Sequence, residues 1–452
     1  MALVGATCAR SRSHTGSIRR LVNTVPPVPP TKPSPPVAGN ATDAGDWFAA
    51  GGAWLVPIPI LAFYLFRALG AGVSTAEDLV TLLVMVPLGG PHVFATYTRT
   101  YFNPAFRRQD PLLFWLGLCV PVIVVGAAAS SAFFDVRIAG VPPIRYVLSF
   151  FFFWAGIHIV HQHIFVASGY EAPASGGVRA RRARLGWVDY AVMLLAMYPA
   201  SFFRMSMISA DPTMRQANPD ALATQIVVSI TGSVEAADLY VFRIGRMAPI
   251  LPEFMMHPAV WIVTTALFLA ACAVFAWKSL RDRRDGTLIK HRFRLVLLMA
   301  SLGSTVPLLP NLDSAFQGLN AWHSFQYLGL AWLMNRRSYD KREIRTGLFD
   351  RTMHDGGHWR FFWTGFGATM GAIAVMLLAA WLITAISGGQ FAMFGHAEPL
   401  LDEAGEPLYR PGSVLLAYYL LGFSFLLVHY LHDGFFFCRR RYLRDSGSPP
   451  VL

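Results

Sequence analysis

Charged residues are scarce in this chain of 452 residues, because Asp, Glu, Lys and Arg make up only 14% of it, whereas soluble domains carry about 25%. Cysteine is also scarce, with four residues in all. No CxxC or CxxCH pattern occurs, so neither a disulfide framework nor a covalently attached c-type haem is indicated. The sequence likewise contains no P-loop, no Gly-x-Ser-x-Gly motif and no internal repeat. No motif of the common nucleotide-binding or serine-hydrolase classes is therefore present to indicate a function.

Long hydrophobic runs are abundant instead. Hydrophobic residues make up 54% of the chain and the mean hydropathy is +0.43. About ten apolar stretches are long enough to cross a ~30 Å hydrocarbon core, which takes roughly 17–25 helical residues. They lie at 47–69, 79–98, 112–134, 145–167, 187–208, 257–277, 295–311, 313–335, 361–386 and 412–437. We therefore predict an all-α fold, a polytopic transmembrane helical bundle of about ten spans.

The net charge of +12 is distributed in a way that argues against nucleic-acid binding. Basic residues gather in alternate loops, whereas the loops between them are acidic or poor in Lys and Arg. The basic clusters lie at 99–108, 179–184, 278–294, 336–345 and 439–444. Because cytoplasmic loops of membrane proteins carry an excess of Lys and Arg, this alternation predicts cytoplasmic termini and an even number of spans. We expect a multi-pass protein of the cell (inner) membrane, in contact with membrane lipids and with no nucleic-acid partner.

Three regions follow from this pattern. Residues 1–45 are Pro-rich and polar and are predicted to be a disordered cytoplasmic tail, because they cannot bury enough apolar area to fold. Residues 46–440 form the transmembrane helical domain, in which 209–256 is the longest loop and is expected on the outer face. Residues 441–452 form a short cytoplasmic tail.

Histidines recur in four of the predicted spans. They are His92, the trio His158, His161 and His163, then His323, and finally His429 and His432, which Asp433 follows. Ionisable side chains inside membrane spans are costly and usually functional, and imidazole is the commonest protein ligand for transition metals. All four spans are even-numbered, so all run inward from the outer face. At 1.5 Å per residue, the distances to the next basic cluster place these imidazoles roughly 10–20 Å from the cytoplasmic boundary.

Spacing within each helix refines the candidate set. His158 and His161 are three residues apart and share a helix face. His429, His432 and Asp433 share a face in the same way, and Asp433 is expected to be a ligand or to orient one. His163 lies about 140° around the helix from His158 and is expected to point elsewhere.

The predicted metal ligands are therefore His92, His158, His161, His323, His429, His432 and Asp433. Tyr327 and Gln326 lie close to His323 in sequence and are the candidate catalytic residues, expected to line an oxygen pocket. Asn, Gln and Tyr side chains in this span are also suited to hold imidazoles in one tautomer.

The histidine segments resemble those of integral-membrane polyhistidine non-haem-iron oxygenases and desaturases, including the Brp/Blh-type carotene dioxygenases. The similar segments are His158-Ile-Val-His161-Gln-His163, Asn320-Ala-Trp-His323, His429-Tyr-Leu-His432-Asp433 and Gly90-Pro91-His92. The resemblance implies one or two non-haem iron ions held by histidines near the cytoplasmic ends of membrane helices.

The predicted function is therefore a membrane-bound, metal-dependent oxidoreductase that acts on a lipid-soluble substrate. With no dinucleotide fold and no redox cysteine pair, electrons come from an external donor or the reaction is a dioxygenation that needs none. Two alternatives stay open at this point. One is a b-haem electron-transfer protein in which facing histidines bind haem axially, and the other is a proton-coupled transporter with the histidines as a relay.

Overall fold

The computed structural model describes residues 50–169, 186–208, 217–241, 249–340, 357–393 and 412–438. Within these ranges the chain is helical and forms no β-strand, only two isolated β-bridges. The all-α prediction is therefore confirmed for this part of the chain. The described residues belong to one compact unit, residues 40–452. The predicted tails at 1–45 and 441–452 lie outside the described residues, as do most of the basic residues at 179–184, 336–345 and 439–444.

The elements follow one another in chain order. They are η1 (Gly51–Leu55), α2 (Pro57–Ala68), α3 (Val73–Val84), η2 (Met85–Gly89), α4 (Gly90–Arg99), α5 (Pro104–Gln109), α6 (Pro111–Phe133), α7 (Pro143–Gly169), α8 (Trp187–Leu195), α9 (Tyr198–Met205), α10 (Leu222–Thr231), α11 (Val234–Asp238), α12 (Glu253–Met256), α13 (Pro258–Arg284), α14 (Lys290–Thr305), η3 (Val306–Leu308), α15 (Leu312–Asp340), α17 (Gly357–Ile386), α18 (Ser413–Ala417), η4 (Tyr418–Gly422) and α19 (Phe423–Cys438). Many begin at or beside a proline, which suits the first helical turn because it has no N–H to leave unpaired.

Seven helical segments among the described residues are long and apolar enough to span a membrane. They are Gly51–Ala68, Thr75–Arg99, Pro111–Phe133, Pro143–Ala167, Pro258–Arg284, Gly357–Ile386 and Ser413–Gly434. The structure thus supports a multi-pass membrane protein, while the predicted count of ten and the side of each terminus stay predictions.

The other three predicted spans are helical but depart from a simple spanning helix. The 187–208 stretch breaks between α8 and α9, just before Pro199. α14 has only 16 residues and ends in the short η3 turn around Pro307. α15 has 29 residues, but polar residues of the histidine region interrupt its apolar sequence. Each departure therefore has a local cause in sequence.

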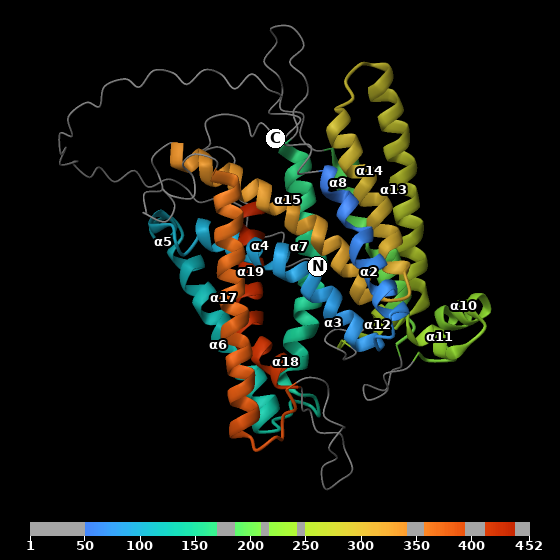
Figure 1. The fold of residues 1–452 in the computed structure, drawn as a ribbon. Coiled ribbons are helices and arrows are strands. Elements are labelled where there is room, and N and C mark those ends of the chain that lie inside the picture. The colour runs from blue at the N-terminus through green and yellow to red at the C-terminus, as the bar shows by residue number, and fades with distance from the viewer. Residues whose placement is uncertain are drawn as a thin grey trace, which may run out of the picture. The chain divides into compact units, whose positions relative to one another are not determined.

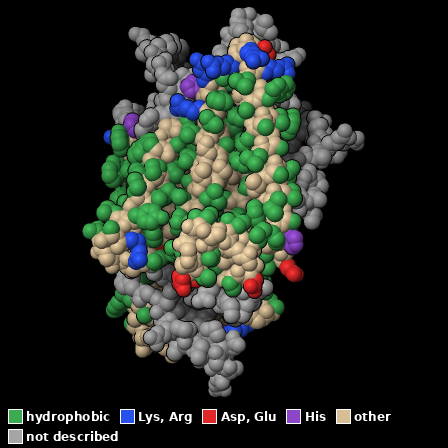
Figure 2. Space-filling view, turned by 90° about the vertical axis from the view of Figure 1, so that its right-hand side faces the viewer, with side chains coloured by type: hydrophobic (Ala, Val, Ile, Leu, Met, Phe, Trp, Pro, Cys, Tyr) green, Lys and Arg blue, Asp and Glu red, His purple; other side chains and the backbone are tan. Residues whose placement is uncertain are grey.

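The surface matches an intramembrane position. Figure 2 shows a broad band of hydrophobic side chains, with most Lys and Arg at one end and most Asp and Glu at the other. The basic end is where α13 finishes with Arg281, Arg283 and Arg284. α13 and α17 bury little of their apolar surface inside the protein, as expected for helices that face lipid.

The four histidine-bearing helices are neighbours. α15 packs against α4 and α7, and α19 packs against α4, α6 and α7. α17 covers α4 on the outside of this group. Figure 1 shows α3 and α4 running on a slant alongside α15, whereas α6, α7, α13 and α17 stand more upright. Helices that are far apart in sequence thus meet in the middle of the bundle.

Two of these helices carry a π-helical turn before their histidine. η2 precedes α4 and its His92, and η4 precedes α19 and its His429. Pro87 lies within η2 and cannot donate a backbone hydrogen bond. π-helical turns are rare and occur frequently at functional sites, so both irregular turns mark the approach to the histidine region.

Candidate metal centre

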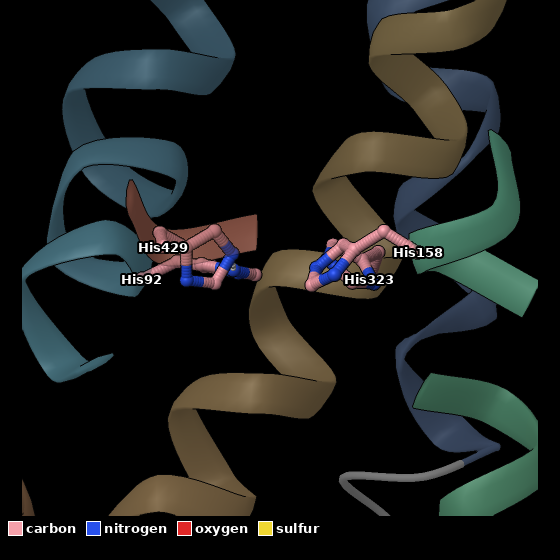
Figure 3. Close-up of side chains that lie close together, drawn as sticks. All are labelled: His92, His158, His323 and His429. Atoms are coloured by element: carbon pink, nitrogen blue, oxygen red, sulfur yellow. Dashed lines mark hydrogen bonds between the residues drawn. The ribbon is translucent and has the colours of Figure 1, made fainter. Parts of the chain in front are cut away.

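Four histidines from four helices converge on one point. They are His92 of α4, His158 of α7, His323 of α15 and His429 of α19 (Figure 3). Each offers one ring nitrogen, and these four atoms all lie within 4.8 Å of one another. The side chains are between 0% and 3% exposed. No hydration shell is available there, so the group has to satisfy its own polar atoms.

The imidazoles meet through their Nε2 atoms in two pairs. Nε2 of His92 lies 2.7 Å from Nε2 of His429, and Nε2 of His158 lies 3.1 Å from Nε2 of His323. The rings pack closely, with centroids 4.4–4.9 Å apart for neighbouring members. Since a metal–nitrogen bond is about 2.0–2.1 Å long, ligand nitrogens on one ion lie about 3–4 Å apart. Small shifts of the rings would therefore place all four nitrogens on one ion.

A polar layer lies one helical turn beyond the histidines. The residue four positions after each histidine is polar in all four helices: Thr96, Gln162, Tyr327 and Asp433. These side chains are all fully buried. Positions i and i+4 share a helix face about one turn apart, so every histidine has a polar neighbour on the same face. The two layers together form a buried polar core where the four helices meet.

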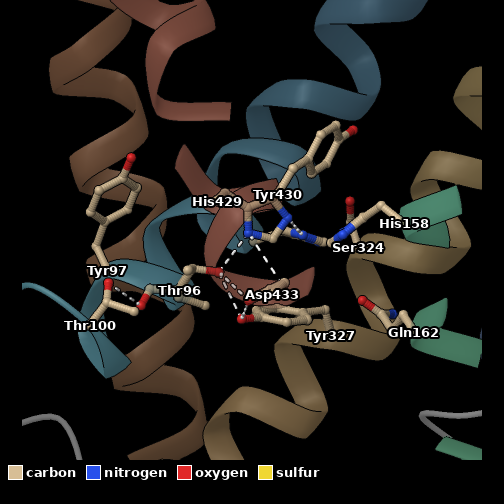
Figure 4. Close-up of polar contacts among 12 residues, drawn as sticks. Thr96, Tyr97, Thr100, His158, Gln162, Ser324, Tyr327, His429, Tyr430 and Asp433 are labelled. Carbon is tan, nitrogen blue, oxygen red and sulfur yellow. Dashed lines mark hydrogen bonds and ion pairs between the residues drawn. The ribbon is translucent and has the colours of Figure 1, made fainter. Parts of the chain in front are cut away.

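Thr96 links three members of these layers (Figure 4). Its Oγ1 lies 2.6 Å from Nδ1 of His429 and 2.7 Å from the hydroxyl of Tyr327. The Tyr327 hydroxyl donates to Oδ1 of Asp433 at 2.8 Å, and Asp433 Oδ2 lies 3.4 Å from His429 Nδ1. The ring of Tyr327 also stacks on His92, with centroids 4.5 Å apart. A hydrogen on Nδ1 of His429 therefore has acceptors, which directs the Nε2 lone pair toward the other histidines.

The opposite side of the group is held by glutamines. Gln162 donates from Nε2 to the backbone carbonyl of His323 and to Oε1 of Gln326, both at 2.9 Å. Gln326, a candidate catalytic residue, is buried in this contact. The amide of Gln162 thereby fixes the backbone turn that carries His323. Gln326 lies beside the histidine group and supports it through Gln162.

The structure does not bring the remaining predicted ligands into the group. His161 is partly exposed on α7. His432 is buried, but its ring lies against Tyr101 and Phe106, with centroids 5.2 and 5.3 Å away. Asp433 contacts Thr96, Tyr327 and Nδ1 of His429, but it is not one of the four residues whose ligand atoms converge; whether it binds an ion or orients His429 stays a prediction.

His163 also lies outside the group of four. It is fully buried, its Nδ1 donates to the carbonyl of Ile159 at 2.8 Å, and its ring meets Trp322 edge-on with centroids 4.4 Å apart. This geometry agrees with the expectation that His163 points away from His158.

Sequence reasoning missed Thr96 and Gln162. The signal that could have found them is the repeated spacing of a histidine followed four residues later by a polar residue. A single threonine or glutamine in one helix indicates little, whereas a polar residue at the same spacing in all four histidine-bearing helices is a pattern.

The donor set fits a transition-metal ion. Four neutral imidazoles in a buried site suit iron, copper or zinc, and their ring nitrogens already lie within 4.8 Å of one another. Without an ion, four buried imidazoles gain only two ring-to-ring hydrogen bonds. An ion would engage all four Nε2 lone pairs at once.

No family model matches this chain, and no curated protein or solved structure is similar enough to it to show a relationship. The site is therefore interpreted from its own residues.

Proposed function

We propose that this chain is a membrane-bound, metal-dependent oxidoreductase that uses non-haem iron at the four-histidine group to oxidise a lipid-soluble substrate with O₂. The observation that supports it most is the convergence of His92, His158, His323 and His429 within 4.8 Å at a buried point of a membrane-type bundle. Ionisable residues gathered inside a membrane protein are functional far more often than structural. The resemblance of these segments to polyhistidine oxygenases favours iron over zinc.

The geometry favours one ion. A second ion about 3.5–4 Å away would need its own ligands, and His161, His163 and His432 do not lie in the group. The same compactness disfavours haem b. Two histidines that bind one haem would lie on opposite faces of the porphyrin, whereas the imidazole rings here pack with their centroids 4.4–4.9 Å apart and leave no space for it.

Thr96, Tyr327 and Asp433 have a positioning role in this proposal. Their hydrogen bonds hold His429 with Nε2 directed into the group and keep the ring from rotating. Partners of this kind typically change metal affinity or activity by about 10–100-fold when lost. Gln162 and Gln326 do the same for the helix turn that carries His323.

The bound iron would activate O₂ for attack on the substrate. Dioxygenation places both oxygen atoms in the substrate and needs no external electrons. Hydroxylation places one oxygen atom in the substrate and releases the other as water, which takes two protons and two electrons from a separate reductant. A lipid-soluble substrate would approach from the bilayer, because the histidines lie within the apolar part of the bundle.

The test is metal analysis and an absorption spectrum of the full-length protein, purified in detergent and loaded anaerobically with Fe(II). We expect about one iron per chain and no Soret band. A Soret band would replace this proposal with the haem alternative. A protein that binds no metal after loading would overturn the oxidoreductase proposal and favour proton-coupled transport.

A further inference from the structure

A second set of buried and half-buried polar residues lies along the line where α3 and α15 pack together. We call this set the polar seam. Its members are Glu77 and Thr81 on α3 and Asn311, Gln317, Asn320 and Ser324 at the start of and along α15. On α3 the two residues are four apart, and on α15 the last three lie at i, i+3 and i+7. Both spacings place the side chains on one helix face, so the seam is a continuous polar stripe on each helix.

Hydrogen bonds join Asn311 to Glu77 at one end of the seam, and they join Thr81 through Gln317 and Asn320 to Ser324 along the rest of it. Asn311 donates to Oε1 of Glu77 at 2.7 Å, and Gln317 reaches Oγ1 of Thr81 at 3.4 Å. Further along α15, Asn320 donates to Gln317 at 3.2 Å. Ser324 then reaches Oδ1 of Asn320 at 3.5 Å, directly beside His323 in sequence. The seam therefore runs from the beginning of both helices to the histidine group.

The turn that precedes the histidine is polar on α15 but apolar on the other three histidine-bearing helices. The residues three positions before the four histidines are Gly89, Ala155, Asn320 and Leu426. Those four positions before are Leu88, Trp154, Leu319 and Phe425. Among these eight residues only Asn320 carries an amide, hydroxyl or charged group, and Trp154 adds one indole N–H that donates to the carbonyl of Tyr430. General polarity around the centre thus does not explain the seam, because the other three helices are apolar at the same depth.

Close packing of α3 against α15 without water between them also explains the seam poorly. From Asn311 to Ser324 the seam extends over thirteen residue steps, about 20 Å at 1.5 Å per step. That is more than half of a ~30 Å hydrocarbon core. Thr81, Gln317 and Asn320 are only half-buried along this length, and polar groups that meet lipid without full hydrogen bonding are costly. Two of the contacts are 3.4 and 3.5 Å long, which is beyond the usual length of a hydrogen bond, so the polar groups of the seam satisfy one another only weakly.

We propose that the polar seam is a water-filled access path through which water and protons pass between the Glu77 end of the bundle and the histidine centre. The carboxyl group of Glu77 marks its mouth, the amides of Gln317 and Asn320 line its middle, and Ser324 is its inner end. That the path leads to a metal centre rests on the function proposed above. The path itself depends only on the residues of α3 and α15.

Cysteine accessibility tests the path directly. In full-length protein whose four native cysteines are replaced by serine or alanine, Thr81→Cys, Gln317→Cys, Asn320→Cys and Ser324→Cys are made one at a time. Each is treated in sealed vesicles with a small, charged, membrane-impermeant methanethiosulfonate. Such reagents attack the thiolate, which forms in water and is suppressed in apolar surroundings. Leu82→Cys is the matched control, because Leu82 adjoins Thr81 but is a 52% exposed, apolar position on α3.

We expect the seam cysteines to react at least tenfold faster than the Leu82→Cys control, and only from the side on which Glu77 lies. The alternation of basic loops predicts that this is the outer side. Ser324→Cys should be the slowest of the seam positions, since it is the deepest. If the seam cysteines react as slowly as the control, the seam is dry and the proposal is wrong. If Ser324→Cys alone stays unlabelled, the path does not reach the centre and the proposal is also wrong.

Two features allow this experiment to decide whether the seam holds water even if some variants fail to fold or bind no metal. Thr81→Cys is nearly isosteric, so it reports on the seam even if a glutamine or asparagine variant fails to fold. Labelling needs no bound metal. A protein that binds no iron but labels along the seam would overturn the proposed function and leave the path standing, whereas an iron-loaded protein with an unlabelled seam would do the reverse.

Discussion

The Oγ1 atom of Thr96 lies 2.6 Å from Nδ1 of His429, so a side chain on α4 orients a histidine of α19. The same hydroxyl lies 2.7 Å from the Tyr327 hydroxyl. Thr96 itself does not belong to the group of four nitrogens. It acts on the centre through His429. A variant of Thr96 can therefore distinguish the orientation of a ligand from the loss of a ligand.

Thr96→Val should weaken metal binding by about 10–100-fold, the usual effect of losing a partner of a ligating histidine. Valine keeps the shape of threonine but leaves Nδ1 of His429 and the Tyr327 hydroxyl without this contact. Competition with a chelator of known affinity measures the change. Thr96→Ser keeps the hydroxyl and is the control, expected to bind within a few-fold of the unchanged protein. Equal affinities for the valine and serine variants would show that the hydroxyl does not orient His429.

Thr96 and Asp433 should act as one unit. Both contact the Tyr327 hydroxyl, at 2.7 and 2.8 Å, and residues that share a hydrogen-bond network are not additive. Asp433→Asn alone should weaken metal binding in the same range as Thr96→Val. The double variant should be no weaker than the more damaging single variant by more than a few-fold. Full multiplication of the two effects in the same chelator assay would mean that the residues act independently.

The histidines should separate into two classes. His323→Ala removes one of the four converging nitrogens and should leave the purified protein with less than a tenth of its iron after dialysis. His161→Ala should keep its iron, because His161 is partly exposed and lies outside the group. Metal analysis of both proteins, prepared side by side, distinguishes them. Iron loss in the His161→Ala protein would return His161 to the ligand set that its spacing from His158 predicts.

His432 gives a second comparison of the same kind. Its ring lies against Tyr101 and Phe106 rather than in the group, so His432→Gln should keep iron where His429→Gln loses it. The two residues are three apart on one helix. The pair of variants therefore tests which face of α19 points toward the histidine group. Loss of iron in both proteins would mean that α19 is rotated relative to the structure.

The sequence predicts which helices carry the centre, but not which side chains meet. Helix direction and depth follow from long hydrophobic runs and the alternation of basic loops, and they place His92, His158, His323 and His429 at a common level. Spacing alone could not decide between His158 and His161, or between His429 and His432. Residues three apart differ by about 60° around a helix. Which of the two points into the group and which points toward α6 or lipid depends on tertiary packing.

The irregular turns of the backbone could not be predicted from hydropathy either. The break between α8 and α9 and the π-helical turns η2 and η4 interrupt stretches that read as uniform spans. Pro199 and Pro87 supply a local signal for two of them. Nothing in the sequence of Tyr418–Gly422 indicates a π-turn rather than an α-turn, because it contains no proline and its glycine stands at the end.

Arg204 provides a prediction about stability, apart from the centre. This fully buried residue of α9 donates to four backbone carbonyls at 2.6–3.1 Å, three of them in the turn between α14 and α15. The three carbonyls belong to Pro307, Leu309 and Pro310, where two prolines leave the chain short of its own donors. The guanidinium therefore fixes the turn from which α15 starts toward His323.

Arg204→Met should lower the free energy of unfolding by on the order of 3 kcal/mol, since each buried carbonyl left without a donor costs about 1–3 kcal/mol and some of them will relax toward water. Thermal unfolding in detergent measures it. Arg137→Met is the control, because Arg137 pairs with Asp135 at 3.5 Å on the surface, where side chains are 27% and 43% exposed and such pairs contribute at most about 1 kcal/mol. Because α15 carries His323, the Arg204→Met protein should also lose iron at a lower temperature than the control. Similar unfolding temperatures for the two variants would show that the turn holds its shape without the guanidinium.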